Sequence, residues 1–480
     1  MSPGRVQARR VIRLLTAELF SLELRTRIPF RYGIATMTDV PQLVMRLTFE
    51  IDGRATQGLA ADLLPPKWFT KDPARGLADE IEEMRRVIRA AVRHAQGVRA
   101  ATAFDFWREL HAAQQAWAAS EKLPPLLAHF GTSLVERAMI HAVCRARGAS
   151  LFAAVRDGLL GLDPATVHPE LERRAFSLLP PADAVIARHT VGLADPITAA
   201  DLAAGERVND GLPQTLEECA RSYGLRHFKI KIEGRLERDL ERLLRIAAVL
   251  AAECGAGFAF SLDGNEGFRD VASFADYFER LKAAPGLVKF WPGLLYIEQP
   301  WHRSVALSPE IGALASAWPA RPPIIIDESD AEIGSLKAAL ALGYAGTSHK
   351  NCKGFFKSLL NTALLARHRE LGGGTTILSG EDLANVGPIS LTQDLAAQAV
   401  LGVTSVERNG HHYFAGLAQF PAAWQRHALA RHADLYEPAE PGGWPRLTIR
   451  GGEISLRSTN GAPFGVPGDM DLAGLEGVAL

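Results

Sequence analysis

Residues 227–266, HFKIKIEGRLERDLERLLRIAAVLAAECGAGFAFSLDGNE, contain a strand, a helix and a second strand, and this unit indicates the fold. The apolar run at 228–232 has the length of a strand, and leucines at helical spacing follow it from Leu236 to Leu244. The next apolar run, 258–262, ends directly at Asp263. Because strands joined through a helix usually lie parallel, this unit predicts a parallel α/β sheet.

The same alternation of short apolar runs and amphipathic helices continues on both sides of this unit. In chain order we expect eight strands, at residues 186–191, 228–232, 258–262, 294–297, 324–326, 344–349, 375–378 and 404–406. Eight parallel strands that alternate with helices are typical of a (β/α)₈ TIM-type barrel. A chain of 480 residues is long enough for this barrel and a smaller second domain.

The flanking segments indicate an α+β capping domain. Residues 43–51 alternate apolar and polar side chains, and Asp52-Gly53 then supplies a hairpin turn. Helices are expected at 77–92, 104–117 and 133–146, and strand-like stretches at 447–449 and 454–456 are expected to close against the first sheet. The predicted domains are 1–160 for the capping domain, 161–430 for the barrel, and 431–480 for a C-terminal segment that returns to the capping domain.

Composition excludes several classes of protein. A formal net charge of -1 gives no electrostatic indication of binding to nucleic acid or to an acidic membrane. The four cysteines are widely spaced without a CxxC motif, which is typical of a reducing compartment. The apolar run at 11–15 is interrupted by Arg13 and is too short for a signal peptide or membrane helix. We therefore expect a cytoplasmic homo-oligomer that binds a small molecule.

Ionisable side chains and one amide stand at the ends of the predicted strands, where TIM-type barrels carry their active sites. In chain order they are Lys229 and Lys231, Asp263 and Asn265, Glu298, Asp327 and Glu328, Lys350, Glu381 and Asp382, and Glu407. A single acid after a strand is more often a helix N-cap or a solvated turn residue. Acids after three successive strands favour a metal ion, and the lack of a His or Cys pair at ligand spacing favours Mg²⁺ over zinc.

Lys229 and Lys231 are two positions apart, so both side chains point to the same face of their strand. We expect that face to be the barrel interior, with Ile230 directed toward the helices. For an isolated pair of this kind, a strand end in solvent is the more frequent explanation. Because a neighbouring cation favours the neutral form of a buried amine, Lys231, nearer the mouth, is a candidate general base.

As an ordered set, these strand ends resemble the enolase superfamily, and within it the mandelate racemase and muconate lactonizing enzyme type. The matching motifs are KxK on the second strand, DxN on the third, EQP on the fourth, DES on the fifth and a lysine on the sixth. The resemblance implies that Asp263, Glu298 and Asp327 bind Mg²⁺, with Mn²⁺ as a substitute, and that Asn265 lies beside them.

The resemblance also implies a reaction. Lys231 and Lys350 would stand on opposite faces of a carboxylate substrate as acid and base, and Lys229 would tune Lys231. The proton next to a carboxylate is weakly acidic, and Mg²⁺ stabilises the enediolate that its removal creates. Two opposed lysines permit racemisation or epimerisation, dehydration or cycloisomerisation, so an isomerase or lyase is expected.

The chain departs from this family pattern after the sixth strand. Residues 350–356 read KNCKGFF and lack the usual Gly-Gly, so Lys353 competes with Lys350 for the lysine role. Glu381 and Asp382 occupy the place where a histidine would mark the racemase type, which favours the lysine type. With Glu407, they are expected to contact the substrate or the groups around it. His411 and His412 receive no role, because a solvated or core imidazole is the more frequent explanation.

The resemblance further implies that two loops of the capping domain, at 28–36 and 60–69, cover the mouth and bring Tyr32 to the substrate. Arg31 and Lys67 are possible partners of a second anionic group, and Trp68 of an apolar one. The long segments 202–213 and 283–292 are possible lids.

Two other functions fit the same residues. In a metal-independent Schiff-base enzyme, Lys231 or Lys350 would attack a substrate carbonyl. A catalytically silent barrel would keep the residues and act as a binding protein.

Overall fold

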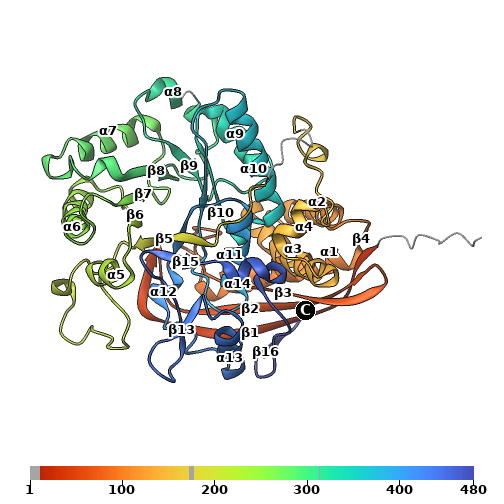
Figure 1. The fold of residues 1–480 in the computed structure, drawn as a ribbon. Coiled ribbons are helices and arrows are strands. Elements are labelled where there is room, and N and C mark those ends of the chain that lie inside the picture. Colours follow the sequence, from red (N-terminus) through yellow and green to blue (C-terminus); the bar gives the residue numbers. More distant parts are fainter. Residues whose placement is uncertain (1–10, 172–177, 313) are drawn as a thin grey trace, which may run out of the picture.

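The structure is a computed structural model that describes residues 11–171, 178–312 and 314–480. Its central sheet is a closed barrel of parallel strands (Figure 1). The strands are β5 (Ala184–Val191), β6 (His227–Lys231), β7 (Ala259–Asp263), β8 (Leu294–Glu298), β9 (Ile324–Ile326), β10 (Gly346–His349), β11 (Ile377–Gly380) and β12 (Ser405–Arg408). Each pairs with the next along the chain, and β12 pairs with β5, so the expected eight-stranded barrel is confirmed.

Helices surround the barrel (Figure 1). They are α5 (Leu216–Tyr223), α6 (Leu236–Cys254), α7 (Val271–Lys282), α8 (Leu314–Ala317), α9 (Ser335–Leu342), α10 (Phe355–Glu370), α11 (Ser390–Val400) and α12 (Gly410–Tyr413). The next helix, α13 (Ala422–Arg431), lies apart from them, beside the C-terminal segment. In α6 the buried face carries Leu243, Ile246 and Leu250, which recur at helical spacing. Ile230 of β6 is buried in the same apolar core, as its position between two inward lysines predicts.

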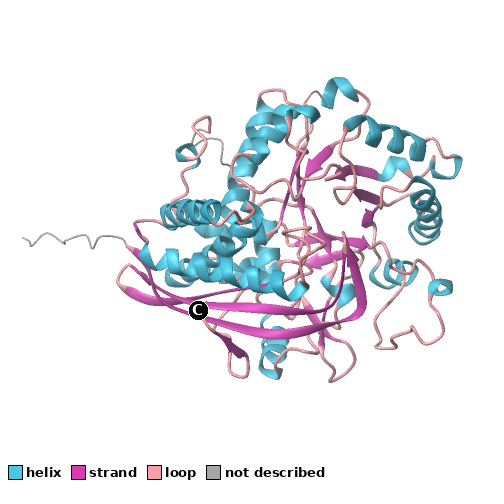
Figure 2. Ribbon diagram, turned by 180° about the vertical axis from the view of Figure 1, so that it is seen from behind, coloured by secondary structure: helices cyan, strands magenta, loops and turns pink. Residues whose placement is uncertain are grey.

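The capping domain is an antiparallel sheet covered on one face by helices (Figure 2). Its strands are β1 (Ile12–Tyr32), β2 (Ala35–Ile51) and β3 (Arg54–Leu63), with the short β4 (Arg99–Ala100) beside β1. Its helices are α1 (Leu77–Gly97), α2 (Ala103–Ser120), α3 (Pro125–Arg147) and α4 (Leu151–Arg156). Asp52 and Gly53 join β2 to β3 with φ of 51° and 79°, as a tight hairpin turn requires. The sequence did not predict the long β1, whose first residues belong to the apolar run at 11–15.

The C-terminal segment pairs with both sheets. After the hairpin of β13 (Tyr436–Pro438) and β14 (Pro445–Leu447), β15 (Glu453–Ser455) lies antiparallel to β5. Following α14 (Arg457–Gly461), β16 (Glu476–Val478) pairs with β1. The expectation that 447–449 and 454–456 close on the first sheet is therefore wrong. Because β6 pairs with β5 only from Arg188 onward, the start of β5 leaves an edge that β15 covers.

Short 3₁₀ helices fill several connections. They are η1 (Pro164–Thr166), η3 (Ala199–Asp201), η4 (Pro285–Leu287), η5 (Trp291–Gly293), η6 (Pro309–Ile311), η7 (Asn351–Lys353) and η8 (Pro463–Gly465). Segment 283–292 contains η4 and lies between α7 and β8, at the amino end of the strand, so it cannot cover the mouth. None of the described helices combines the length and apolar content needed to cross a bilayer.

Candidate functional site

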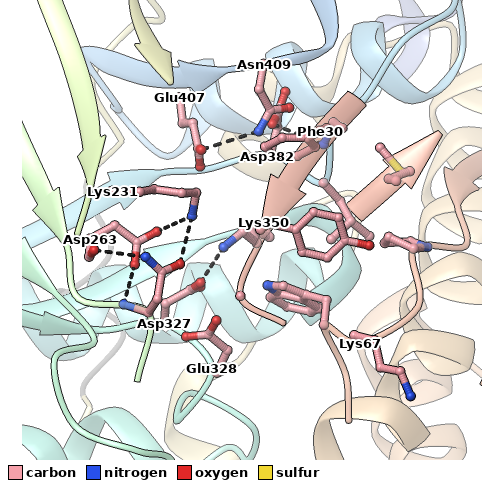
Figure 3. A pocket seen from close by; sticks show the side chains of 18 of the residues that line it. Phe30, Lys67, Lys231, Asp263, Asp327, Glu328, Lys350, Asp382, Glu407 and Asn409 are labelled. Atoms are coloured by element: carbon pink, nitrogen blue, oxygen red, sulfur yellow. Dashed lines mark hydrogen bonds and ion pairs between the residues drawn. The ribbon is translucent and has the colours of Figure 1, made fainter. Parts of the chain in front are cut away.

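A cavity that is partly open to solvent lies at the carboxyl ends of the barrel strands beneath the capping domain (Figure 3). From the capping domain it is lined by Phe30, Tyr32, Gly33, Met37, Pro65, Lys67, Trp68 and Lys71. From the barrel it is lined by Lys229, Lys231, Asp263, Asn265, Asp327, Glu328, Lys350, Asp382, Leu383, Ala384, Glu407 and Asn409. Both loops expected to cover the mouth contribute to the lining.

Lys231 and Lys350 enter this cavity from opposite sides of the barrel (Figure 3). Lys231 ends β6 and Lys350 directly follows β10, and three strands separate β6 from β10 in either direction around the closed sheet. The side chains of the acids Asp263, Glu298 and Asp327 come from the ends of the three strands between them on one side. A substrate in the cavity would therefore have one lysine on each of two faces.

Lys229 lies deeper in the barrel, at the centre of a group of carboxylates. Its Nζ is 2.9 Å from Glu298, 2.7 Å from Glu381, 3.0 Å from Glu407 and 3.3 Å from Asp263. Burial alone would lower the pKa of Lys229, but these carboxylates together raise it well above its usual value. Lys229 is therefore protonated at neutral pH, and its ion pairs hold the four acids together.

Asn265 and Asp263 hold the ammonium group of Lys231. Lys231 Nζ donates to Asp263 Oδ2 at 2.6 Å and to Asn265 Oδ1 at 3.2 Å, and Asn265 N donates to Asp263 Oδ1 at 2.9 Å. Burial acts to raise the pKa of Asp263, yet the two lysines lower it to about 2. Asn265 has a φ of 48°, in a left-handed region that asparagine tolerates better than most residues. This backbone conformation lets one residue orient the acid through its backbone N–H and the lysine through its side-chain oxygen.

Lys350 and Lys353 both contact Asp327, but from different places. Lys350 lines the cavity and forms an ion pair with Asp327 Oδ2, below the ring of Trp68, whose centroid is 5.0 Å from Lys350 Nζ. Lys353 donates to Asp327 Oδ1 at 2.9 Å and to the carbonyl oxygens of Asp327 and Ser348. Burial would lower the pKa of Lys350, but Asp327 raises it above its usual range. Lys353 is fully occupied in holding Asp327, which leaves Lys350 as the lysine that a substrate can reach.

The three acids suit Mg²⁺ in type, because all their donors are carboxylate oxygens. Glu298 Oε2 is buried and accepts no hydrogen bond from any described residue, although Lys229 Nζ lies 2.9 Å away. Burial and Glu381 raise the pKa of Glu298 well above its usual value, which a bound cation would reverse. Among the described residues, oxygens of Asp263, Glu298 and Asp327 do not all lie within 4.8 Å of one another. Binding of Mg²⁺ therefore requires Lys231 and Lys350 to release Asp263 and Asp327.

Arg188 is a buried cation beneath the cavity that the sequence reasoning missed. Its guanidinium donates to Glu381 at 2.5 Å and to Ser379 Oγ at 2.8 Å, and it lies over the ring of Tyr296. Burial acts to raise the pKa of Glu381, while Lys229 and Arg188 act to lower it. The sequence could have indicated this contact, because an arginine within an apolar barrel strand is buried and therefore needs an acidic partner. Glu381 is thus held below the cavity and does not line it among the described residues.

Glu407 and Asp382 line the cavity on the side away from the proposed metal ligands. Glu407 accepts from Thr190 Oγ1 at 2.7 Å and from Lys229 at 3.0 Å, and Lys229 lowers its pKa although burial opposes the shift. Burial raises the pKa of Asp382 to about 8, against the opposing effect of Arg408 at 3.4 Å. Glu328 lines the opposite wall, where burial and Glu266 raise its pKa.

The residues of the capping domain differ in whether their side chains are available to contact a substrate. Tyr32 lines the cavity and donates its hydroxyl to the carbonyl of Pro66 at 2.7 Å. Lys67 points away from Lys350 (Figure 3) and binds Glu80 at 2.9 Å, so it cannot take the anion-binding role considered above without breaking this pair. Arg31 is exposed and is absent from the described lining. Lys71, which the sequence reasoning did not select, reaches Glu266 and the carbonyl of Asn265.

His411 and His412 lie outside this cavity, in α12, as far as the described lining shows. His412 is buried, and His411 is partly exposed.

No family model matches the sequence, and no curated protein sequence matches it. Solved structures do match. An enolase from Bradyrhizobium complexed with magnesium and mandelic acid is 14% identical, with a TM-score of 0.56 over 95% of this chain and 96% of that one. A muconate lactonizing enzyme from Pseudomonas fluorescens complexed with muconolactone is 19% identical, with a TM-score of 0.53 over 82% and 87%.

A mandelate racemase/muconate lactonizing enzyme-like protein from Rubrobacter xylanophilus is 16% identical, with a TM-score of 0.52 over 94% of this chain and 99% of that one. At these identities the similarity concerns the fold, and it covers both the barrel and the capping domain. The chain therefore has the fold of the enolase superfamily, in the form seen in mandelate racemase and muconate lactonizing enzyme-like proteins.

Proposed function

We propose that the chain is a Mg²⁺-dependent enzyme that removes the proton alpha to a substrate carboxylate. The resulting enediolate would lead to racemisation or epimerisation, dehydration or cycloisomerisation, so the enzyme would be an isomerase or a lyase. The observation that carries this proposal is the entry of Lys231 and Lys350 into one cavity from opposite sides, with carboxylates from three consecutive strands between them.

Asp263, Glu298 and Asp327 would hold the metal ion, and Mn²⁺ would be a substitute. Bound there, Mg²⁺ supplies positive charge to the carboxylate oxygens of the substrate as negative charge develops on them. Lys229 keeps Glu298 beside Glu381 and Glu407, so it fixes the donors before the substrate arrives. Such preorganisation avoids rearrangement of charged groups during the reaction.

Lys350 and Lys231 would transfer the proton. Each lysine is paired with a carboxylate, Lys231 with Asp263 and Lys350 with Asp327, so one would act as the base and the other as the acid, and these pairs do not distinguish the two roles. Exchange of the two roles gives the opposite stereochemical course. The ring of Trp68 covers Lys350, which limits the access of water to that face.

The lining supports a small carboxylic acid with an apolar substituent as the substrate. Phe30, Met37, Trp68 and Leu383 form an apolar part of the wall, opposite the ionisable residues of the barrel. Polar groups in such a site fix orientation, while apolar walls bury the remainder of the ligand.

The test is exchange of the alpha proton of candidate carboxylates in D₂O, followed by NMR with and without Mg²⁺. We expect Mg²⁺-dependent exchange that falls by about 10²- to 10⁴-fold in Lys231→Ala and in Lys350→Ala, as is usual for loss of an acid–base group. Lys337→Ala is the matched control, because Lys337 is an exposed lysine of α9 that pairs with Glu170. Exchange that survives both single replacements would refute the proposed roles.

The structure disfavours the form of the metal-independent Schiff-base alternative that uses Lys350. A lysine that attacks a carbonyl has to be neutral, whereas Asp327 raises the pKa of Lys350 although burial would lower it. Trapping of a carbonyl substrate by borohydride without Mg²⁺ would reverse this conclusion. Metal binding without exchange across a broad set of carboxylates would favour a binding protein.

A further inference from the structure

A second group of potential ligands lies behind the barrel wall. Ligand atoms of His189, Cys219 and His412 all lie within 4.8 Å of one another. Arg188 and Thr190 of β5 contact Glu381 and Glu407, so His189 between them points outward, toward the helices. Cys219 belongs to α5 and His412 to α12, and all three side chains are buried.

One spacing within this group, and one to a histidine outside it, match those around a tetrahedral metal ion as well as those of a hydrogen bond. Cys219 Sγ is 3.6 Å from His412 Nδ1, and His189 Nδ1 is 3.2 Å from Nε2 of a third histidine, His411. Around tetrahedral Zn²⁺, a nitrogen and a sulfur ligand lie about 3.6 Å apart and two nitrogens about 3.3 Å. Nδ1 of His411 is a buried atom that accepts and donates no hydrogen bond among the described residues.

A buried carboxylate lies near His412. Asp195 Oδ2 is 4.0 Å, beyond hydrogen-bond distance, from His412 Nε2, the ring nitrogen opposite the one that faces Cys219. Asp195 is itself held by the hydroxyl of Tyr413 at 2.6 Å and by the backbone N–H of Gly192 at 2.7 Å.

A small cavity lies beside this group. His411 and Tyr223 line it together with Leu212, next to the long loop before α5, whereas His189, Cys219 and His412 are not among its described lining residues.

We propose that His189, Cys219 and His412, with His411 as the neighbouring nitrogen, bind a divalent ion of the zinc type at a site separate from the barrel mouth. A site made of imidazoles and one thiol selects such an ion over Mg²⁺. On binding, the Cys219 thiol loses its proton to solvent and a metal–sulfur bond forms. The ion ties the end of β5 to α12 and α5, where β12 closes the barrel on β5.

Cobalt titration tests this site directly. Metal-free full-length protein, in excess MgCl₂ to occupy the oxygen ligands at the mouth, is titrated with Co²⁺ and followed by absorption. We expect one Co²⁺ per chain with thiolate-to-cobalt charge-transfer absorption, and loss of that absorption in Cys219→Ser. Cys254→Ser is the matched control, because Cys254 is also buried but donates to the carbonyl of Leu225, outside the cluster.

The wild-type protein alone already decides the outcome, even if Cys219→Ser fails to fold. Absence of charge-transfer absorption in the wild type, or identical absorption in Cys219→Ser, would overturn the proposal and leave a hydrogen-bonded core of neutral side chains. As a second readout, we expect Zn²⁺ to raise the thermal unfolding midpoint of the wild type and of Cys254→Ser, because an ion that binds only the folded state stabilises it. Neither the cobalt absorption nor the shift in the unfolding midpoint depends on catalysis. The proposed metal site can therefore be refuted while the proposed function holds.

Discussion

Lys350 and Lys353 show how closely spaced residues of the same type take different roles. The chain after β10 turns into η7 (Asn351–Lys353), which directs Lys350 into the cavity and Lys353 beneath Asp327. The sequence placed Lys350 directly after a strand but left Lys353 as a competitor. Only the position of Asp327, on another strand, distinguishes the two.

Glu136 is a buried carboxyl group beside the same turn. Its Oε1 accepts from the backbone N–H of Phe356 at 2.5 Å, whereas its Oε2 accepts no hydrogen bond from a described residue. Burial raises the pKa of Glu136 to about 8, although the Phe356 N–H acts to lower it. In the unfolded chain the group titrates near 4.5, so between these values the folded state holds a proton that the unfolded state has lost.

We predict that Glu136→Gln removes a pH-dependent loss of stability. In the wild type, protonated Glu136 contributes fully below pH 4.5, and this contribution decreases by at most about 1.4 kcal/mol per pH unit up to pH 8. The difference in unfolding free energy between variant and wild type should therefore rise from pH 5 to pH 8 and then level off. Urea unfolding across this range measures it, and a difference that stays constant with pH would show that Glu136 ionises normally.

At the scale of elements, the packing of α1 against α3 depends on one glycine. A Cβ on Gly131 of α3 would lie 2.3 Å from the carbonyl oxygen of Val87 in α1. Backbone atoms cannot yield as a flexible side chain can, so the two helices would have to separate. Their spacing matters for the site because α3 also packs against β3 and η7, which flank the loop 60–69 and Lys350.

We predict that Gly131→Ala lowers the free energy of unfolding by about 1–3 kcal/mol, the usual effect of overpacking. Gly97→Ala is the control, because Gly97 ends α1 and has no atom within 4 Å of the added Cβ. That variant should be neutral or slightly more stable, since alanine favours a helix. Urea unfolding of both variants gives the comparison, and equal stabilities would mean that the helices adjust without cost.

At the scale of the whole molecule, Arg303 joins the capping domain to the barrel. It follows β8 and donates to Glu266 at 2.7 Å, to the carbonyl of Phe69 at 2.8 Å and to that of Trp68 at 3.0 Å. Lys71 adds an ion pair to the same glutamate. The loop that carries Trp68 over Lys350 is therefore held to the barrel mainly at this point.

We predict that Arg303→Gln loosens this loop and slows catalysis. Amide hydrogen exchange in residues 64–75 should become faster. Alpha-proton exchange of a substrate should fall by roughly 10- to 100-fold, because a small displacement of the loop that covers the site reduces the rate of catalysis strongly. Arg238→Gln is the control, since Arg238 is exposed and forms a surface ion pair with Glu233 at 3.7 Å, away from the loop. Unchanged amide exchange in 64–75 would show that other contacts hold the loop.

The sequence by itself determined the barrel and the character of its mouth. Strands and helices follow from local periodicity, and the period of two in β6 alone directed Lys229 and Lys231 inward and Ile230 outward. The order of acids and lysines at the strand ends needed no further information, because the carboxyl ends of parallel strands meet at one face.

Only the tertiary structure decided which of these residues meet. Arg188 binds Glu381, Lys353 supports Asp327, β15 joins the barrel, and Cys219 reaches His412 across 193 positions. Such contacts depend on how the barrel closes and how the capping domain docks. Local periodicity in the sequence does not predict these contacts, because they result from packing the whole chain into one core.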